Sequence, residues 1–470
     1  MFLRGVVMPI ITYKAYGRNN VADPLDVGAP VPKIKAVVFT EMVDLVNADP
    51  DNNGGCSLRP GFVKRYDGDV RSMFANDGII LFHEGSALKQ FNPDTYGSSF
   101  LNITLDPAGD VAYGDVNGLI VYSDGTIIRK IYQGADHALP VPTATFKEAT
   151  PPGQCFSVFK QHLLVGQDDG FVVTDPESVD EMDSRLCRFP MGGPAVMIVP
   201  VDGGLYVSTD TRVFFIAGAG LPQWLAPDAV REVVDVPAFP GTAITLKGEQ
   251  TGLKDVTGNI CMFATSMGYY YGLPGGVVLS TRDKVRPGVF AAGTAVLREL
   301  NGMRHYLAVL RTAGGAYHGE VLKLETMGAA RYTGYDFRSV VSHKGRLFGC
   351  NEEGIFELTG KTDDGLPIQA SGLGGISNCG SDRIKYFPSV HLTMRCEGQM
   401  EFSLAVDEKP AIPYPVDFAE GREGIHKKLR KLAKGVTGGQ AQIGWKNVDG
   451  CDFKLQQVEL EVLPTNRSVN

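Results

Sequence analysis

The sequence lacks the long hydrophobic runs, low-complexity tracts and single-sign charge that assign some chains to a special class. None of the apolar runs in its 470 residues approaches the about 18 residues of a membrane span. Its charged fraction of 21% and hydrophobic fraction of 43% are ordinary for a globular protein. Its net charge of -8 is mildly acidic, which argues against electrostatic wrapping of DNA. These absences exclude a polytopic membrane protein and wholesale disorder.

The sequence also lacks the short motifs that carry catalysis or bind metals. It contains no CxxC pair, no HExxH and no GxSxG. Gly354 and Gly360 precede a Lys-Thr pair, but the spacing between these glycines is one residue too long for a phosphate loop. An EF-hand-like start at Asp49 has Pro60 where the loop needs its last glutamate. We therefore expect no enzyme activity, no cofactor and no metal, and interpret Asp49–Gly54 as a tight hairpin turn.

The cysteines fall at spacings that fit neither a zinc site nor a dense disulfide framework. We interpret them as buried thiols of a protein that assembles in a reducing cytosol, while their even number leaves disulfides open as the alternative. Pro9 interrupts the apolar N-terminal residues and no small-residue cleavage site follows, so we expect no secretory signal. The cysteines are Cys56, Cys155, Cys187, Cys261, Cys350, Cys379, Cys396 and Cys451.

What the sequence does contain is an internal repeat of β-hairpins. The 57 glycines and 28 prolines indicate many turns. Seven segments each place two β-type runs around a turn, most often Asp-Gly, Gly-Gly or Glu-Gly. The first apolar residues of these segments are 37 to 44 residues apart, except for one step of 64. A four-stranded propeller blade has about 40–45 residues. The first apolar residues are Ile79, Leu119, Leu163, Leu205, Tyr269, Tyr306 and Leu347.

The repeat predicts an all-β fold with a β-propeller of about seven blades, or six if one hairpin belongs to an insertion. We place the propeller at residues 61–360 and a C-terminal β-sandwich or jelly-roll-like domain at 361–470. Residues 1–60 are expected to form an extended arm and a β-hairpin that pack on the propeller or on a neighbour. Because a closed propeller shares strands between its ends, residues before Gly78 should complete the sheet that contains Leu347–Leu358.

Three segments interrupt or blur this pattern. The long step covers Gly218–Asn259, which we interpret as a loop insertion between two blades. Ser178–Cys187 fits one or two helical turns. Gly424–Lys434 fits both a helix, through Ile425 and Leu429, and an imperfectly alternating strand. Helical signals are otherwise scarce, which argues against α/β enzyme folds with crossover helices.

The Gly424–Lys434 segment also carries the densest cluster of positive charge in the chain. One interpretation is an interface with nucleic acid or with an acidic neighbouring subunit. The other is a solvated face, which the acidic balance of the whole chain favours. The candidate interface residues are Lys427, Lys428, Arg430, Lys431 and Lys434.

Two stretches resemble a known family. The first is Leu45–Phe74, LVNADPDNNGGCSLRPGFVKRYDGDVRSMF, in which an acidic hairpin turn leads into an Arg-Pro-Gly segment. The second runs from Gly345 to the end and contains GRLFGCNEEGIFELTGKTDDGLPIQA, SDRIKYFPSVHLTMRCEG and NVDGCDFKLQQVELEVLP. Together they resemble the virion proteins that form the tail nozzle, tail tube or tail hub of short-tailed phages.

The resemblance implies a structural protein of the phage tail, with a propeller and β-domains, that forms a ring of six copies below the portal. Its partners would be other tail, adaptor or portal proteins, with no membrane span. DNA would pass through the ring during genome ejection without sequence-specific binding, along a channel whose acidic lining repels phosphates. Such a protein assembles in the host cytoplasm and resides in the virion. Two alternatives stay open: a carbohydrate-binding or glycan-hydrolysing propeller, and a soluble protein-interaction propeller.

The cysteine interpretation gives a direct prediction. Thiol titration of the denatured, unreduced protein should detect about eight free thiols, because a cytosolic protein keeps its cysteines reduced. Detection of two or fewer thiols would contradict assembly in a reducing compartment.

Overall fold

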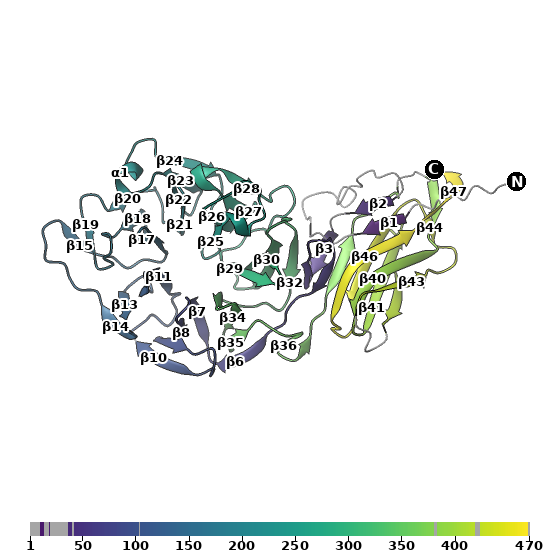
Figure 1. Ribbon diagram of the computed structural model, residues 1–470, viewed down its shortest axis with the longest axis horizontal. Helices are drawn as coiled ribbons and strands as arrows, with labels where there is room; N and C mark the ends of the chain where they lie inside the picture. The colour runs from purple at the N-terminus through teal and green to yellow at the C-terminus, as the bar shows by residue number, and fades with distance from the viewer. Residues whose placement is uncertain are drawn as a thin grey trace.

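β-Strands dominate the computed structural model, which describes residues 10–13, 18, 36–39, 42–102, 104–379, 383–418 and 424–468. Figure 1 shows a ring of small sheets beside a β-sandwich. The helical elements of the described residues are α1 (Leu221–Trp224) and two 3-10 turns, Gly248–Gln250 and Pro274–Gly276. Within the described ranges, no helix has the length and apolar character to cross a membrane. The fold is the expected all-β class, a β-propeller followed by a sandwich.

The propeller consists of seven units of four antiparallel strands. The β-branched and aromatic residues of these strands fill the space between neighbouring units. Inner strands that are buried on both faces are therefore apolar over most of their length. The first blade contains β7 (Val70–Ala75), β8 (Ile80–Glu84), β9 (Ala87–Phe91) and β10 (Ser98–Asn102), and the second contains β11 (Ala112–Val116), β12 (Leu119–Ser123), β13 (Ile128–Tyr132) and β14 (Ala135–Ala138). The third contains β16 (Phe156–Phe159), β17 (His162–Gln167), β18 (Gly170–Val173) and β20 (Arg188–Phe189). The fourth contains β21 (Met197–Val201), β22 (Gly204–Ser208), β23 (Val213–Ala217) and β24 (Val230–Val234).

The last three units complete the ring. The fifth blade contains β25 (Ile244–Lys247), β26 (Asn259–Thr265), β27 (Gly268–Gly272) and β28 (Val278–Ser280). The sixth contains β29 (Ala292–Leu300), β30 (Met303–Arg311), β31 (Tyr317–Lys323) and β32 (Ala329–Tyr332). The seventh contains β33 (Ser339–His343), β34 (Arg346–Asn351), β35 (Gly354–Glu357) and β6 (Val63–Asp67). Two short ribbons lie outside these units, β15 (Lys147–Ala149) with β19 (Glu181–Asp183), and β36 (Thr362–Asp363) with β37 (Leu366–Pro367).

The ring closes through a strand from the N-terminal side. β6 pairs antiparallel with β35, so that Tyr66 lies opposite Ile355. This pairing confirms the expectation that residues before Gly78 complete the last sheet. Hydroxyl groups near the axis link successive blades, because Ser72, Thr294 and Ser339 each accept a hydrogen bond from a backbone N–H of the next blade at 3.1–3.2 Å.

Two local expectations were wrong. Gly218–Asn259 is no loop insertion between blades, since it contains α1, the outer strand β24 and the inner strand β25. The repeat mark at Tyr269 falls on the third strand of its blade, because the second strand, β26, ends in a turn without the Asp-Gly signature. Ser178–Cys187 contains β19 instead of helical turns, and within β19 the buried Met182 alternates with half-exposed neighbours as in a strand.

The C-terminal part is a sandwich of two sheets around a shared apolar core. One sheet has the order β2 (Ala36–Phe39), β1 (Ile10–Tyr13), β46 (Phe453–Glu461), β40 (Ser389–Cys396), β43 (His426–Lys431), with β5 (Cys56–Leu58) and β4 (Ala48–Pro50) attached to β46. The other has the order β3 (Met42–Val46), β38 (Ser371–Gly374), β45 (Ala441–Asn447), β41 (Gln399–Val406), β42 (Ile412–Asp417). A small sheet joins β44 (Thr437–Gly438), β39 (Arg383–Tyr386) and β47 (Leu463–Ser468).

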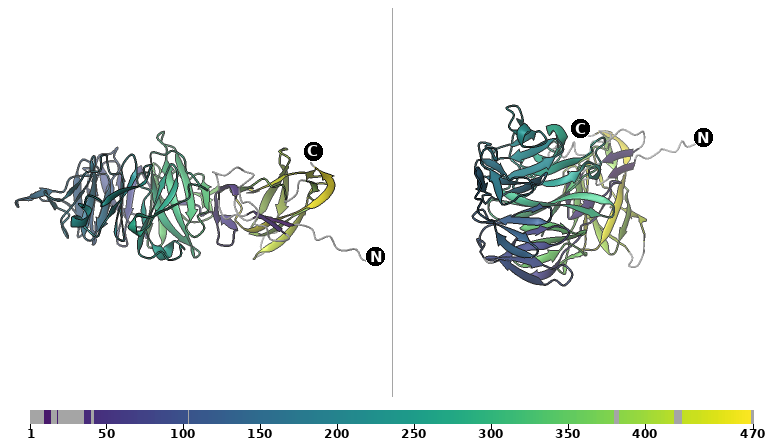
Figure 2. Two further views of the ribbon diagram at one scale, coloured as in Figure 1. Left: turned by 90° about the horizontal axis from the view of Figure 1, so that it is seen from above. Right: turned by 60° about the vertical axis from the view of Figure 1, so that its left-hand side comes forward.

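The two bodies share one sheet. β3 lies between β32, the outer strand of the sixth blade, and β38 of the sandwich, which makes a continuous sheet of nine strands. Both views of Figure 2 show the described strands of the sandwich continuing outward from the rim of the ring. The N-terminal segment thus forms the joint between propeller and sandwich, and β4 and β5 within it form the expected hairpin at Asp49–Gly54.

Arg59 lies at the centre of this joint, with 1% of its surface exposed. Its guanidinium forms a bidentate ion pair with Asp363, at 2.6 and 2.8 Å. It also donates to the Asn47 side chain at 2.9 Å and to the carbonyls of Thr333 and Pro60 at 2.8 and 2.9 Å. One side chain therefore connects the N-terminal segment, the end of the sixth blade and the start of the C-terminal domain, with all of its donors used.

A second buried ion pair strengthens the joint. Arg298 on β29 lies 2.8 Å from Asp49 on β4, and it donates to the Tyr332 hydroxyl at 2.9 Å. The Tyr332 hydroxyl in turn donates to Asp49. His305 lies opposite Arg298 in the sheet, and burial together with the Arg298 charge lowers the pKa of His305 to about 4. The imidazole is therefore neutral at pH 7, which avoids a further buried positive charge.

Substitution of Arg59 tests the joint. Arg59→Met should lower the free energy of unfolding by about 3–5 kcal/mol, because it leaves Asp363 without its buried counter-charge and removes one of the two donors to the Asn47 side-chain oxygen. Urea denaturation followed by circular dichroism measures this change. Arg188→Met is the control, since its ion pair with Glu148 is half-exposed, and should shift the value by less than about 0.5 kcal/mol. An Arg59→Met protein as stable as the control would contradict the proposed importance of the joint.

Candidate functional site

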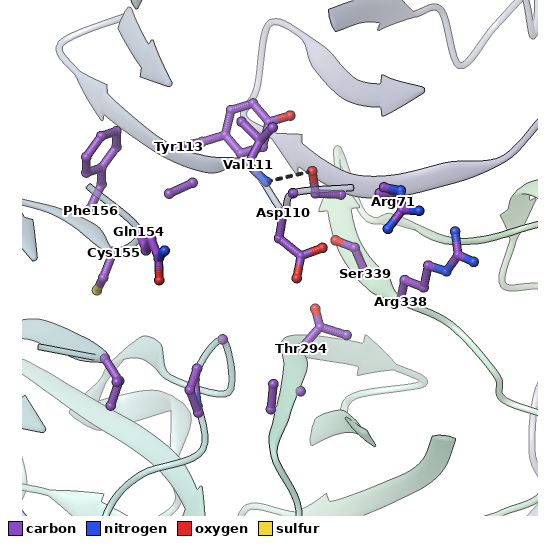
Figure 3. Close-up of a pocket in the computed structure, with 18 of the residues that line it drawn as sticks. Arg71, Asp110, Val111, Tyr113, Gln154, Cys155, Phe156, Thr294, Arg338 and Ser339 are labelled. Atoms are coloured by element: carbon purple, nitrogen blue, oxygen red, sulfur yellow. Dashed lines mark hydrogen bonds between the residues drawn. The ribbon is translucent and has the colours of Figure 1, made fainter. Parts of the chain in front are cut away.

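A cavity lies on the propeller axis, where the first strand of each blade begins. It has a volume of about 860 Å³ and is lined by residues of all seven blades. Figure 3 shows side chains from different blades gathered around it, among them Arg71, Asp110, Gln154, Thr294 and Arg338. A volume of this size is typical of sites for small ligands.

An irregularity in the first blade directs a cation into this cavity. The pairing of β7 with β8 shifts register between Val70 and Met73, which is a β-bulge at Arg71 and Ser72. Bulges change the direction of a side chain and are frequent beside functional sites. Arg71 donates to the Ala108 carbonyl at 3.2 Å and has no carboxylate partner among the described residues. Its charge is therefore available to a ligand.

Two further arginines reach the same wall of the cavity. Arg311 lies 3.5 Å from the exposed carboxylate of Asp110. Arg338 lies 3.3 Å from Glu352 and also donates to Asp69, so its charge is already compensated. Of the three guanidinium groups on the wall contributed by the sixth, seventh and first blades, that of Arg71 is the one without a carboxylate partner among the described residues. A guanidinium group suits carboxylate, sulfate or phosphate oxygens.

Two groups of the cavity that could serve in catalysis, the Asp124 carboxylate and the Cys155 thiol, have structural roles or low reactivity. Burial raises the pKa of Asp124, but backbone N–H groups of Ile127, Asp106 and Thr126 outweigh this effect and hold the pKa below its ordinary value. Asp124 is thus an ionised turn residue. Burial raises the pKa of the Cys155 thiol to about 11, which makes it a poor nucleophile at pH 7. Within the described ranges, no group of three histidine, cysteine or acidic residues could hold a metal ion. The arrangement is suited to binding an anion.

The candidate interface residues lie elsewhere, at the edge of the sandwich. Gly424–Lys434 forms the edge strand β43 and a following turn, which resolves the ambiguity in favour of a strand. Lys427 pairs with Glu459 at 2.7 Å, and the Lys428 ammonium lies 4.4 Å from the centroid of the Phe418 ring. The structure brings four of these residues together on the strand and places the fifth, Lys434, in the turn.

Three of the cations have no carboxylate partner in the part of the chain that the structure describes. The side chains of Arg430, Lys431 and Lys434 are exposed and make no ion pair with any described residue. Lysine and arginine on an edge strand prevent unwanted strand pairing. This role agrees with the interpretation of the basic cluster as a solvated face. The neighbouring edge strand β42 is protected differently, because Pro413 and Pro415 offer no N–H to an incoming strand.

Sequence reasoning did not identify the cavity arginines. Arg71 enters the cavity through a bulge, and Arg311 through its position at the end of β30 near the axis, neither of which has a local sequence signature. Arg59 and the other N-terminal residues of the joint entered the sequence analysis only as part of the stretch Leu45–Phe74, on which the family resemblance rests. Arg59 follows an acidic turn there, and a lone arginine before proline does not by itself indicate burial.

Comparisons with known proteins add little to this geometry. No family model matches the chain, and no curated protein matches it. Similar solved structures include the extracellular domain of a hybrid two-component system from B. thetaiotaomicron, at 10% identity and a TM-score of 0.44, covering 86% of this chain and 62% of that one. Virginiamycin B lyase from Staphylococcus aureus is another, at 13% identity and a TM-score of 0.39, covering 62% of this chain and 95% of the lyase. The chain spans 62% of the length of the first structure, and likenesses of this level assign no activity.

Proposed function

We propose that the chain is a structural component of a phage tail, one subunit of a ring below the portal through which DNA leaves the virion. The observation that supports this proposal is the meeting of the two stretches that resemble tail proteins. Arg59 of the first stretch pairs with Asp363 of the second, and β6 of the first completes the sheet of β35 in the second. Residues about 300 positions apart thus belong to one structural unit.

The joint gives the molecule a property that a tail ring needs. A subunit that transmits force between neighbours must not bend at its domain boundary, and flexible linkers are the usual arrangement between domains. Here a shared nine-stranded sheet and two buried ion pairs replace a linker. This construction supports a role in the virion that requires mechanical rigidity.

The ring itself would use the basic edge of the sandwich. Arg430 and Lys431 are exposed cations, whereas the chain as a whole has 53 acidic and 45 basic residues. A head-to-tail contact between β43 and the acidic surface of the next copy is electrostatically favourable and closes into a ring when the rotation permits. We propose six copies, assembled in the host cytoplasm, with a channel that binds no DNA sequence specifically.

Charge reversal of the basic edge tests this proposal. Negative-stain microscopy and native mass spectrometry of the wild-type protein should detect closed rings. The variant with Lys427, Lys428, Arg430 and Lys431 changed to Glu should stay folded by circular dichroism but no longer assemble, because like charges now meet at the contact. A control that changes four exposed propeller cations, Lys247, Lys254, Arg282 and Lys344, to Glu should still form rings. A wild-type protein that stays monomeric would refute the ring, and a variant that assembles normally would refute the role of the edge.

The axial cavity favours a second candidate function, a propeller that binds an acidic carbohydrate. Its support is the Arg71 guanidinium, which enters a ligand-sized cavity without a carboxylate partner among the described residues and has Arg311 on the same wall. Guanidinium groups bind sugar carboxylates through paired hydrogen bonds. This function is compatible with a virion protein that contacts a cell surface, and equally with a protein unrelated to phages.

Titration calorimetry with uronic- or sialic-acid oligosaccharides, compared with neutral sugars of the same size, tests this candidate. It predicts selective binding of the acidic sugars and at least a tenfold loss of affinity in the Arg71→Gln/Arg311→Gln variant, since each charge-assisted hydrogen bond contributes about 1.5–3 kcal/mol. Arg188→Gln, which changes an arginine on the outer rim, should bind as the wild type does. Equal or absent binding of acidic and neutral sugars would remove the candidate.

A further inference from the structure

Two of the eight cysteines lie in contact with each other. The eight cysteines are free, but the Sγ atoms of Cys396 and Cys451 are only 3.5 Å apart. Cys396 is the last residue of β40, and Cys451 lies in the turn that precedes β46. A disulfide needs the sulfurs about 2 Å apart, so a movement of about 1.5 Å would bring the pair to bonding distance.

The turn that carries Cys451 can provide this movement. Asp449 and Gly450 have positive φ angles of 52° and 69°, which places them in a turn outside the strand ladder. The movement would not have to break a strand pairing, because β46 begins only at Phe453. The Sγ of Cys451 donates to the Gln399 carbonyl at 3.0 Å, on the side of the following strand β41. The approach to Cys396 thus requires only a small shift of one turn.

The two thiols differ in a way that suits disulfide chemistry. Cys451 is half-buried, whereas Cys396 is 6% exposed. The neighbouring Cys396 thiol lowers the pKa of Cys451 in spite of burial, and the contact with Cys451 followed by burial raises the pKa of Cys396. Cys451 is therefore the more accessible thiol and the better nucleophile of the pair.

The other six cysteines lack these features. Burial raises the pKa of Cys155 and Cys379 to about 11, and it also raises the pKa of the remaining four. None of the six makes a sulfur–sulfur contact with another described cysteine. Oxidation should therefore be selective for one pair.

The pair lies directly beside the connection between propeller and sandwich. Lys361, just after the last blade, bridges Glu397 at 2.8 Å and Asp452 at 2.9 Å. These two acids are the residues that immediately follow Cys396 and Cys451 in the sequence. A covalent bond between the cysteines would fix the relative position of the two carboxylates that hold Lys361.

We propose that Cys396 and Cys451 are a site of covalent modification that accepts a small-molecule disulfide as its oxidant and becomes an intramolecular disulfide. The Cys451 thiolate attacks one sulfur of the small disulfide, forms a mixed disulfide and releases one thiolate. Cys396 then attacks the Sγ of Cys451, its proton passes to the second departing thiolate, and the protein disulfide forms. Two protein thiols are oxidised and one small disulfide is reduced to two thiols.

The modification would respond to a change of compartment. In a glutathione-reduced cytosol both thiols stay free, which agrees with the expected eight thiols of the newly made protein. Outside it the bond forms, closes the loop from Cys396 to Cys451 and reduces the freedom of the unfolded sandwich. This inference does not rest on the proposed tail function, since the reaction requires only that this protein leave the reducing cytosol.

Equilibration of the folded, reduced protein in glutathione redox buffers tests the proposal. Oxidising buffers should remove the mass of two hydrogens, peptide mapping should find Cys396 linked to Cys451, and the melting temperature should rise by about 4 °C or more. No loss of mass, or a crosslink between other cysteines, would overturn the proposal.

Single variants separate the two roles. Cys396→Ser should accumulate one glutathione on Cys451, because the resolving thiol is absent. Cys451→Ser should acquire neither crosslink nor glutathione, since Cys396 is buried and its pKa is raised. Cys155→Ser is the control and should form the disulfide as the wild type does. Equal glutathionylation of the Cys396→Ser and Cys451→Ser proteins would refute Cys451 as the nucleophile, and a Cys155→Ser protein that cannot crosslink would refute the selectivity.

Discussion

A single buried guanidinium connects the parts of this molecule that are farthest apart in the sequence. Arg59 contacts Asn47, Thr333 and Asp363, which belong to the N-terminal segment, the sixth blade and the entry to the sandwich. A buried charge is stable only when its partners are fixed in place, so these three segments must be assembled together or not at all. In the sequence Arg59 lies between the shared strand β3 and the closing strand β6, which pair with β32 and β35.

This constraint separates the roles of the two bodies. The propeller offers an axial cavity whose shape is maintained by hydrogen bonds to hydroxyl groups between blades, and which Arg71 enters without a carboxylate partner among the described residues. The sandwich offers the edge strand β43, on which Arg430 and Lys431 are exposed and make no ion pair with a described residue. Because the joint holds both bodies in one sheet, a ligand in the cavity and a neighbour at the edge would act on one rigid unit. That combination is the physical basis of the proposed structural role.

The repeat was readable from the sequence because hairpins are local. Second and third strands such as Leu119–Ser123 and Ile128–Tyr132 flank an Asp-Gly turn. Five of the seven repeat marks fall on the second strand of a blade, and Ile79 lies one residue before it. Tyr269 lies on the third strand, since the turn before it has no such signature. The pairing of β3 with β32 and β38 depends on contacts about 300 residues apart, and the bulge at Arg71 is set by register, so neither leaves a local pattern. The basic cluster was visible, but its strand conformation depends on pairing with β40.

Hydrogen–deuterium exchange across the joint tests the central claim that propeller and sandwich form one rigid body. The amides of β3 (Met42–Val46) pair with strands of both bodies. The account predicts that these amides exchange as slowly as those of the inner blade strand β30, because they can open only when the joint itself opens. If β3 exchanges rapidly while β30 stays protected, the two bodies move independently and the account is contradicted.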